Sequence, residues 1–138
     1  MTLFLAPLLA IAVLIGVAVL LAAQKGRQAH LVGTLVEPDT VRSSAPAVLF
    51  FTGENCNVCH TAQKPALAQV AESFANDVEI QEIDVAQRPE LARAYRVMTL
   101  PTTVVLAAGG RVSHINVGFA TAETLRAQLR ALGAPVAA

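Results

Sequence analysis

Cysteine is scarce in this chain of 138 residues, and neither sign of charge is in excess. The only two cysteines, Cys56 and Cys59, stand three positions apart. A secreted scaffold stapled by disulfides would need more cysteines at wider spacings, because a bridge between these two closes too short a loop to remove much chain entropy. Ten basic residues balance ten acidic ones, so no nucleic acid or acidic substrate is expected as a partner. The cysteine pair therefore points to chemistry rather than to stability.

Charged residues are absent from the first 23 positions, and Leu3–Ala23 is a continuous uncharged run. A helix of this length spans roughly 30 Å at about 1.5 Å per residue, the thickness of a bilayer's hydrocarbon core. The alternative, a cleaved signal peptide, would need Lys or Arg before a shorter run and a small residue where Leu21 stands. We therefore expect an uncleaved, single-pass transmembrane helix over residues 3–23.

The charges that follow this run predict its orientation. Lys25 and Arg27 come directly after it, and positive residues beside a span tend to remain in the cytoplasm. We therefore expect the rest of the chain to be cytoplasmic, with an extracytoplasmic location as the alternative. The predicted organisation is a transmembrane anchor at 1–24, a linker with a shortened N-terminal element at 25–46, a folded domain at 47–133 and a tail at 134–138.

Strand-like and helix-like segments alternate along the folded domain. Ala47–Thr52 is an apolar run between Pro46 and Gly53, typical of a strand buried on both faces. The other predicted strands are Val78–Val85, Thr103–Ala107 and Arg111–Val117, with shorter elements before the domain at Leu31–Val36 (a strand) and Pro38–Arg42 (one helical turn). The predicted helices run from Asn57 to Phe74 with a kink at Pro65, from Pro89 to Tyr95, and from Thr121 to Leu132.

The order of these elements predicts how the sheet is connected. Right-handed crossover makes the first two strands of the domain parallel neighbours. A hairpin at Gly109-Gly110 then adds two antiparallel strands. The expected fold class is therefore α/β, with a central mixed β-sheet flanked by helices and preceded by one N-terminal transmembrane helix.

The stretch Cys56-Asn57-Val58-Cys59 lies between a predicted buried strand and a predicted helix. Unpaired N–H groups and the helix dipole at that point stabilise a thiolate on Cys56. Such a thiolate attacks a disulfide to give a mixed disulfide, and Cys59, one turn along, displaces the product. We therefore expect Cys56 to be the exposed nucleophile and Cys59 the more buried resolving thiol.

The sequence of the folded domain resembles the thioredoxin family over about residues 47–132. Phe51–Cys59 looks like the family's strand and active-site segment, Asp84-Val85 with Pro89–Tyr95 like its next strand and helix, and Leu100-Pro101-Thr102 like its cis-proline loop. The resemblance implies that Pro101 is cis and faces the dithiol, and that the backbone of Leu100 pairs with a substrate. It also implies a thiol–disulfide oxidoreductase of cell redox homeostasis that acts on client protein disulfides.

The chain departs from the family pattern in ways that limit this implication. Phe50 stands where thioredoxins usually carry a buried Asp, Glu82 stands near the position of its Lys partner, and Asn55 replaces the usual Trp. The dipeptide between the cysteines is Asn-Val rather than Gly-Pro. One more residue lies between Cys59 and Pro65 than in the usual thioredoxin pattern. We hypothesise that Glu82 accepts the proton of Cys59; the alternative is a surface carboxylate on a half-exposed strand.

Three other interpretations compete with a redox site. Cys56-x-x-Cys59-His60 matches the c-type haem attachment motif, with Met98 or His114 as a sixth ligand. A zinc site would combine the same three residues with His30 or His114. The third is a thioredoxin-like interaction module with an idle dithiol. The flanking strands and Leu100-Pro101-Thr102 favour the redox site. No metal, nucleotide or flavin motif occurs, so no cofactor is expected and electrons must come from a protein or small thiol.

Overall fold

A computed structural model describes residues 5–29, 44–75 and 77–134 of the chain. These residues belong to two compact units, one ending at His30 and the other beginning at Leu31. The predicted strand at Leu31–Val36 and the predicted turn at Pro38–Arg42 lie outside the described residues, as does His30.

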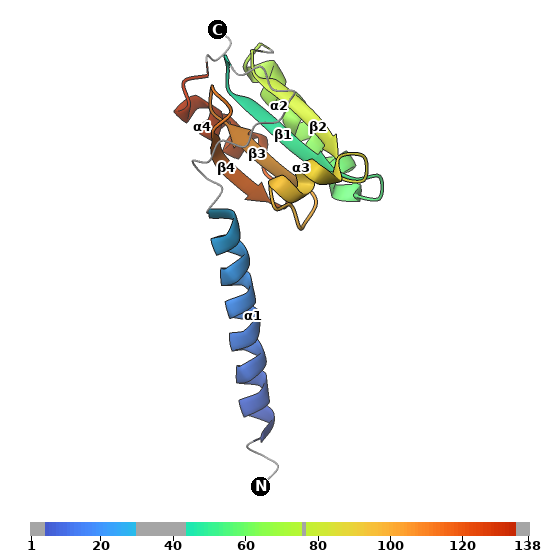
Figure 1. Cartoon of the computed structure of the whole chain (residues 1–138), viewed down its shortest axis with the longest axis vertical. Coiled ribbons are helices and arrows are strands. Elements are labelled where there is room, and N and C mark those ends of the chain that lie inside the picture. The colour runs from blue at the N-terminus through green and yellow to red at the C-terminus, as the bar shows by residue number, and fades with distance from the viewer. Residues whose placement is uncertain (1–4, 30–43, 76, 135–138) are drawn as a thin grey trace. The chain divides into compact units, whose positions relative to one another are not determined.

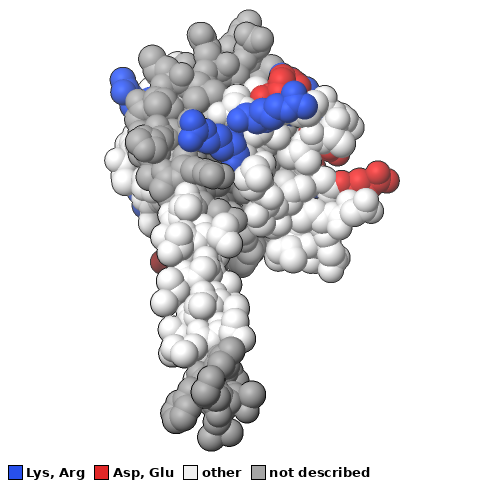
Figure 2. All heavy atoms as spheres, turned by 60° about the horizontal axis from the view of Figure 1, so that its bottom comes forward, with Lys and Arg blue, Asp and Glu red and all other residues white. Residues whose placement is uncertain are grey.

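The first unit is a single helix, α1 (Leu5–Ala29). Its described side chains, at positions 7–23, carry no charge and are all exposed. Figure 2 shows one side of this uncharged surface. None of the described helices is long and apolar enough to cross a bilayer. The helix predicted at residues 3–23 is therefore present, but it is not found as a membrane span.

The second unit is built on a mixed sheet of four strands. The strands are β1 (Ala47–Thr52), β2 (Glu79–Asp84), β3 (Thr102–Leu106) and β4 (Val112–Val117), in the spatial order β2-β1-β3-β4 (Figure 1). β1 and β2 are parallel, whereas β3 is antiparallel to both β1 and β4. β1 has its predicted bounds, and the other strands end within one residue of theirs. The predicted connectivity of the sheet is therefore confirmed.

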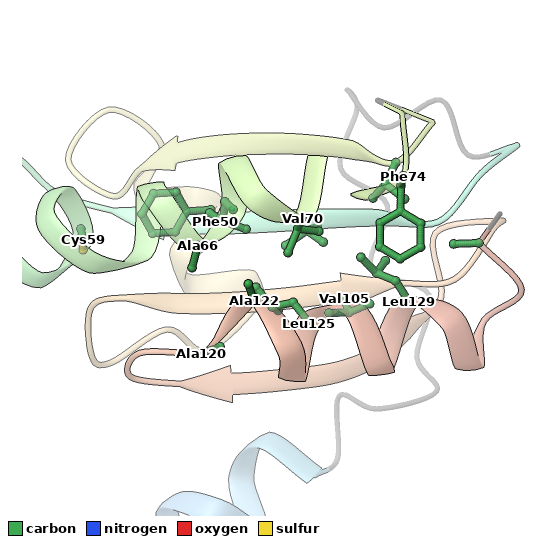
Figure 3. Packing of buried hydrophobic residues seen from close by; sticks show 14 residues of the cluster. Phe50, Cys59, Ala66, Val70, Phe74, Val105, Ala120, Ala122, Leu125 and Leu129 are labelled. Carbon is green, nitrogen blue, oxygen red and sulfur yellow. The ribbon is translucent and has the colours of Figure 1, made fainter. Parts of the chain in front are cut away.

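Helices cover both faces of this sheet. On one face, Val48 and Phe50 of β1 pack with residues of α2 (Lys64–Ser73) and α4 (Ala122–Ala131). Figure 3 shows Phe50, Val70, Val105 and Leu125 gathered between the sheet and these two helices. On the other face, Leu49 and Phe51 pack with residues of α3 (Pro89–Ala94). β1 is therefore the buried centre of the domain, as its unbroken apolar sequence predicts.

The helix that follows β1 differs from the prediction at one place. It is helical from Asn57, but Cys59–Gln63 forms a π-helical turn, η1, before α2 begins. The N–H of Lys64 donates to the carbonyl of Cys59, five residues back, and Pro65 has no N–H to restore the regular pattern. The extra residue before Pro65 is therefore absorbed as a π turn.

Candidate active site

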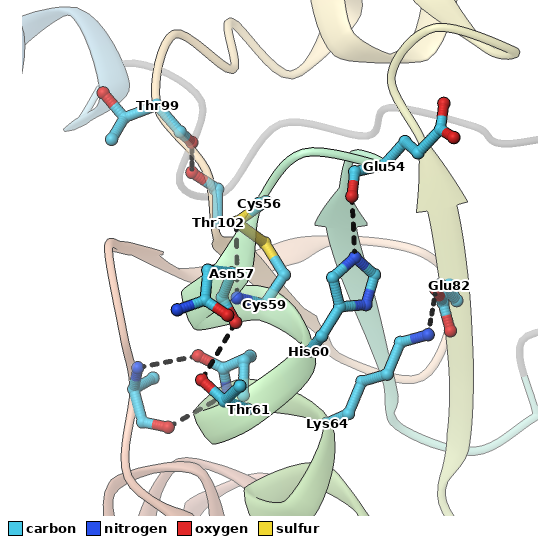
Figure 4. Close-up of a disulfide and its surroundings, with 12 residues drawn as sticks. Glu54, Cys56, Asn57, Cys59, His60, Thr61, Lys64, Glu82, Thr99 and Thr102 are labelled. Carbon is cyan, nitrogen blue, oxygen red and sulfur yellow. Dashed lines mark hydrogen bonds and ion pairs between the residues drawn. A yellow bond between two sulfur atoms is a disulfide. The ribbon is translucent and has the colours of Figure 1, made fainter.

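Cys56 and Cys59 form a disulfide where the chain leaves β1 and enters the helix (Figure 4). Their Cα atoms are 5.3 Å apart. Cys56 is partly exposed, whereas Cys59 is fully buried. The two cysteines thus differ in exposure as the sequence predicts: Cys56 is accessible to a partner and Cys59 is not.

Backbone hydrogen bonds fix the position of Cys56 at the helix start. Its N–H donates to the carbonyl of Gly53 at 3.0 Å, and its own carbonyl accepts from the N–H of His60 at 3.3 Å. The N–H of Cys59 points at the Cys56 sulfur, with 3.3 Å between the nitrogen and Sγ. Because an N–H at a helix start favours negative charge on a nearby sulfur, this contact stabilises a Cys56 thiolate once the disulfide is reduced.

The loop before β3 carries the second part of the site. The Leu100–Pro101 peptide bond is cis, as the resemblance implied, and the carbonyl of Pro101 accepts from the N–H of Gly118 at 2.8 Å. Leu100 lies close to Gly53, since a Cβ on that glycine would be 3.0 Å from Leu100 Cδ1. The absence of a side chain at Gly53 therefore lets the cysteine loop approach the cis-proline loop.

Glu82 is not buried beside Cys59. Among the described residues, the buried polar side chains are Thr52, Gln63, Thr102 and Thr103, and none of them is charged. Glu82 is paired with Phe50 across the strands but lies exposed on the edge strand β2, where its carboxylate is 2.9 Å from Lys64 Nζ (Figure 4). This geometry favours a surface carboxylate over a proton acceptor for Cys59.

The side chains proposed as metal ligands do not form a metal site in the described part of the chain. His60 is exposed and its Nε2 lies 3.2 Å from the carbonyl oxygen of Glu54. His114 is opposite Val105 along β3, with its Nδ1 2.9 Å from Ser113 Oγ, and Met98 is 84% exposed. No group of three His, Cys, Asp or Glu side chains in the described part of the chain is placed to hold a metal.

Gln63 is a buried polar residue near the cysteines in the sequence that was not predicted to have a role. Its side chain is fully buried at the end of η1, one turn after Cys59. Its Nε2 donates to the carbonyl of Ala120 at 3.0 Å, and the N–H of Ala120 donates back to its Oε1 at 2.9 Å. The only feature of the local sequence that draws attention to Gln63 is the extra residue between Cys59 and Pro65. That feature does not reveal that the side chain of Gln63 binds Ala120, 57 positions away.

Comparisons with known proteins agree with this geometry. Residues 37–131 match the family model for Thioredoxin. A thioredoxin from Alicyclobacillus acidocaldarius is 29% identical over 89 residues, which are 64% of this chain and 83% of that protein. One from Mycobacterium tuberculosis is 30% identical over 77 residues, 56% of this chain and 66% of that protein.

Solved structures show the same fold. A thioredoxin-like protein from Clostridium perfringens has a TM-score of 0.62 at 23% identity, over 73% of this chain and 82% of that one. Chloroplastic thioredoxin z has a TM-score of 0.57 at 27% identity, over 66% and 80% of the two chains. With its Cys-x-x-Cys pair joined as a disulfide at the start of a helix, the chain belongs to the thioredoxin family and is a thiol–disulfide oxidoreductase.

Proposed function

We propose that this protein exchanges electrons with the disulfides of client proteins through Cys56 and Cys59, while its N-terminal helix holds it at a membrane. The observation that carries the redox part is the unequal exposure of the two cysteines at the start of the helix. Cys56 is accessible and has an N–H directed at its sulfur, and Cys59 is buried beneath it. This arrangement separates an attacking thiol from a resolving one.

The reaction proceeds in two exchanges when the protein acts as a reductant. The Cys56 thiolate attacks one sulfur of the client disulfide, so the client S–S bond breaks, a client thiolate leaves and a mixed disulfide forms. Cys59 then loses its proton and attacks the Cys56 sulfur, which releases the second client thiolate and forms the Cys56–Cys59 disulfide. Two electrons pass to the client, and a protein or small thiol restores the dithiol.

The surface around the cysteines supports a protein as the client. In residues 44–134 as described, the exposed large apolar side chains are Val58, Met98, Val117 and Phe119. Val58 stands between the cysteines, Met98 precedes the cis-proline loop, and Val117 pairs with Thr102 directly after Pro101. Exposed apolar side chains gathered on the segments that build one site are typical of a protein contact surface. Leu100 and Pro101 would bind the backbone of the client there.

Reduction of insulin by dithiothreitol, followed with the full-length chain, tests the redox proposal. We expect the wild type to accelerate reduction and Cys56→Ser to return it to the uncatalysed rate. Cys59→Ser should instead accumulate a mixed disulfide between Cys56 and insulin, visible on a non-reducing gel, because the resolving thiol is missing. Undiminished activity of Cys56→Ser would reject the proposal. A wild type that does not accelerate reduction would support an idle dithiol.

The membrane part of the proposal is supported by α1. The uncharged run at residues 3–23 leaves apolar side chains exposed all round the helix at its described positions, and a helix that is apolar on every side is normally covered by lipid or protein. Lys25 and Arg27 favour a cytoplasmic domain. A chain attached in this way remains with the membrane pellet after extraction with alkaline carbonate, whereas a peripheral one is released.

A further inference from the structure

Gln63 joins the helix that carries the cysteines to a loop far away in the sequence. An amide side chain that is fully buried needs partners for its donors and its acceptor. Gln63 finds them in the backbone of Ala120, through one bond in each direction, at 3.0 and 2.9 Å. Because Ala120 belongs to the buried cluster that also contains Cys59 (Figure 3), these bonds lie inside the domain and not at its surface.

The loop Gly118–Ala120 is held at both of its ends. At the first end, the N–H of Gly118 donates to the carbonyl of Pro101 at 2.8 Å, and Gly118 has the positive φ of 81° that glycine adopts readily. At the second end, Ala120 is bound to Gln63. Phe119 lies between these two points, and 48% of its surface is exposed. The loop is therefore bonded to the cis-proline segment at one end and to the cysteine helix at the other, and it carries a half-exposed aromatic side chain between these two attachment points in the sequence.

We propose that Gln63 is a positioning residue for client binding: it holds the Gly118–Ala120 loop so that Phe119 contacts an apolar side chain next to the disulfide of a protein client. This proposal rests on the proposed function. A loop that is already ordered loses little conformational entropy when the client binds. Without Gln63 the Ala120 end of the loop is released, and Phe119 has to be ordered at each binding event.

The proposal predicts different effects on large and small substrates. A protein client contacts Phe119, so its KM depends on the position of the loop. A small aromatic disulfide such as 5,5′-dithiobis(2-nitrobenzoate) needs only the Cys56 sulfur, so its rate of reduction does not. We expect Gln63→Ala to raise the KM for insulin roughly fivefold, the effect of losing one moderate contact. The kcat for insulin and the rate with the small disulfide should stay near the wild-type values.

Phe119→Ala provides the matched test of the route from Gln63 to the client. It should raise the KM for insulin at least as much as Gln63→Ala does. Adding Gln63→Ala to Phe119→Ala should cause no further increase, because Gln63 acts only through the contact that Phe119 makes. Equal losses with both substrates, additive effects in the double variant, or an unchanged KM for insulin would each overturn the proposal. Failure of the wild type with both substrates would instead reject the proposed function.

Gln63→Glu keeps the proposal testable if the alanine variant does not fold. A carboxylate still accepts from the N–H of Ala120 but cannot donate to its carbonyl, whereas a protonated carboxyl group does both. Relative to the wild type at each pH, we expect the KM of this variant for insulin to be raised at high pH and restored as the carboxyl group takes up a proton. A ratio of KM values that does not change with pH would overturn the proposal.

Discussion

At the scale of single residues, Phe50 is the departure with the largest consequence for the chemistry. It packs in the buried cluster with Cys59, at a position where the resemblance to thioredoxins implies a buried Asp. Glu82, the carboxylate closest along the sheet, is paired with Lys64 instead. Among the described residues no acidic side chain is buried. In the proposed reaction, the proton of Cys59 therefore passes to solvent or to the client thiolate that leaves first.

On the opposite face of β1, Tyr95 provides a prediction about alkaline pH. Its ring is fully buried, with 5.5 Å between its centroid and that of Phe51. Burial disfavours the phenolate and raises the pKa of Tyr95 to about 12. A group whose pKa is higher in the folded state stabilises the fold below its unfolded pKa, about 10 for tyrosine. That contribution to the free energy of unfolding, roughly 2 to 3 kcal/mol, is lost as the pH rises from about 10 through the pKa of Tyr95 in the folded protein.

Tyr95→Phe isolates this effect from the titration of other groups. The difference in unfolding free energy between the wild type and the variant should shift against the wild type as the pH rises above about 10, measured by urea denaturation. Tyr95 is the only tyrosine and the chain has no tryptophan, so phenolate absorbance reports this one residue. Ionisation of the native protein with the pKa of free tyrosine would contradict the prediction.

At the scale of elements, local signals were sufficient for most of the domain. Pro46 and Gly53 delimit β1, Gly109-Gly110 turns the chain between β3 and β4 with positive φ at both glycines, and Thr121 starts α4. Each of these signals acts within a few residues of the element it defines. Neighbouring residues alone therefore predicted these boundaries.

The elements that the sequence analysis missed depend on distant partners. An extra residue before Pro65 can be absorbed as a kink, a bulge or a π turn, and the local sequence does not choose among them. The observed turn η1 ends in Gln63, whose side chain is bound to Ala120, 57 positions away. The pairing of Glu82 with Lys64 likewise joins β2 to the start of α2. Such contacts are consequences of the fold, so they became visible only in the structure.

The start of α4 offers a prediction at this scale. Thr121 is the N-cap, and its Oγ1 accepts a hydrogen bond from the N–H of Thr124 at 3.1 Å. Thr121→Ala removes this acceptor and should lower the unfolding free energy by about 1 kcal/mol, measured by urea denaturation. Thr121→Ser keeps the hydroxyl group and should stay close to the wild type. If serine were as destabilising as alanine, the capping bond would not be the cause.

At the scale of the whole molecule, the two units differ in what they contain. The second unit contains both cysteines and the cis-proline, within a folded core. The described side chains of α1 include no titratable or nucleophilic group, and they are exposed. Among the described residues, the groups that can carry the redox chemistry therefore lie in the second unit, and the proposed role of the first is to set which compartment the dithiol meets. That compartment decides the reductant and the clients that are available.

The orientation of α1 is a prediction that charge changes can test. On the membrane proposal, Lys25 and Arg27 keep the domain in the cytoplasm, because positive residues beside a span resist translocation. We expect a green fluorescent protein fused to the C-terminus to be fluorescent and an alkaline phosphatase fused there to be inactive. Lys25→Gln with Arg27→Gln, combined with lysines inserted after Met1, should reverse both results. If both reporters keep their activities in this variant, these charges do not set the orientation. If the phosphatase is active on the unaltered chain, the dithiol lies outside the cytoplasm.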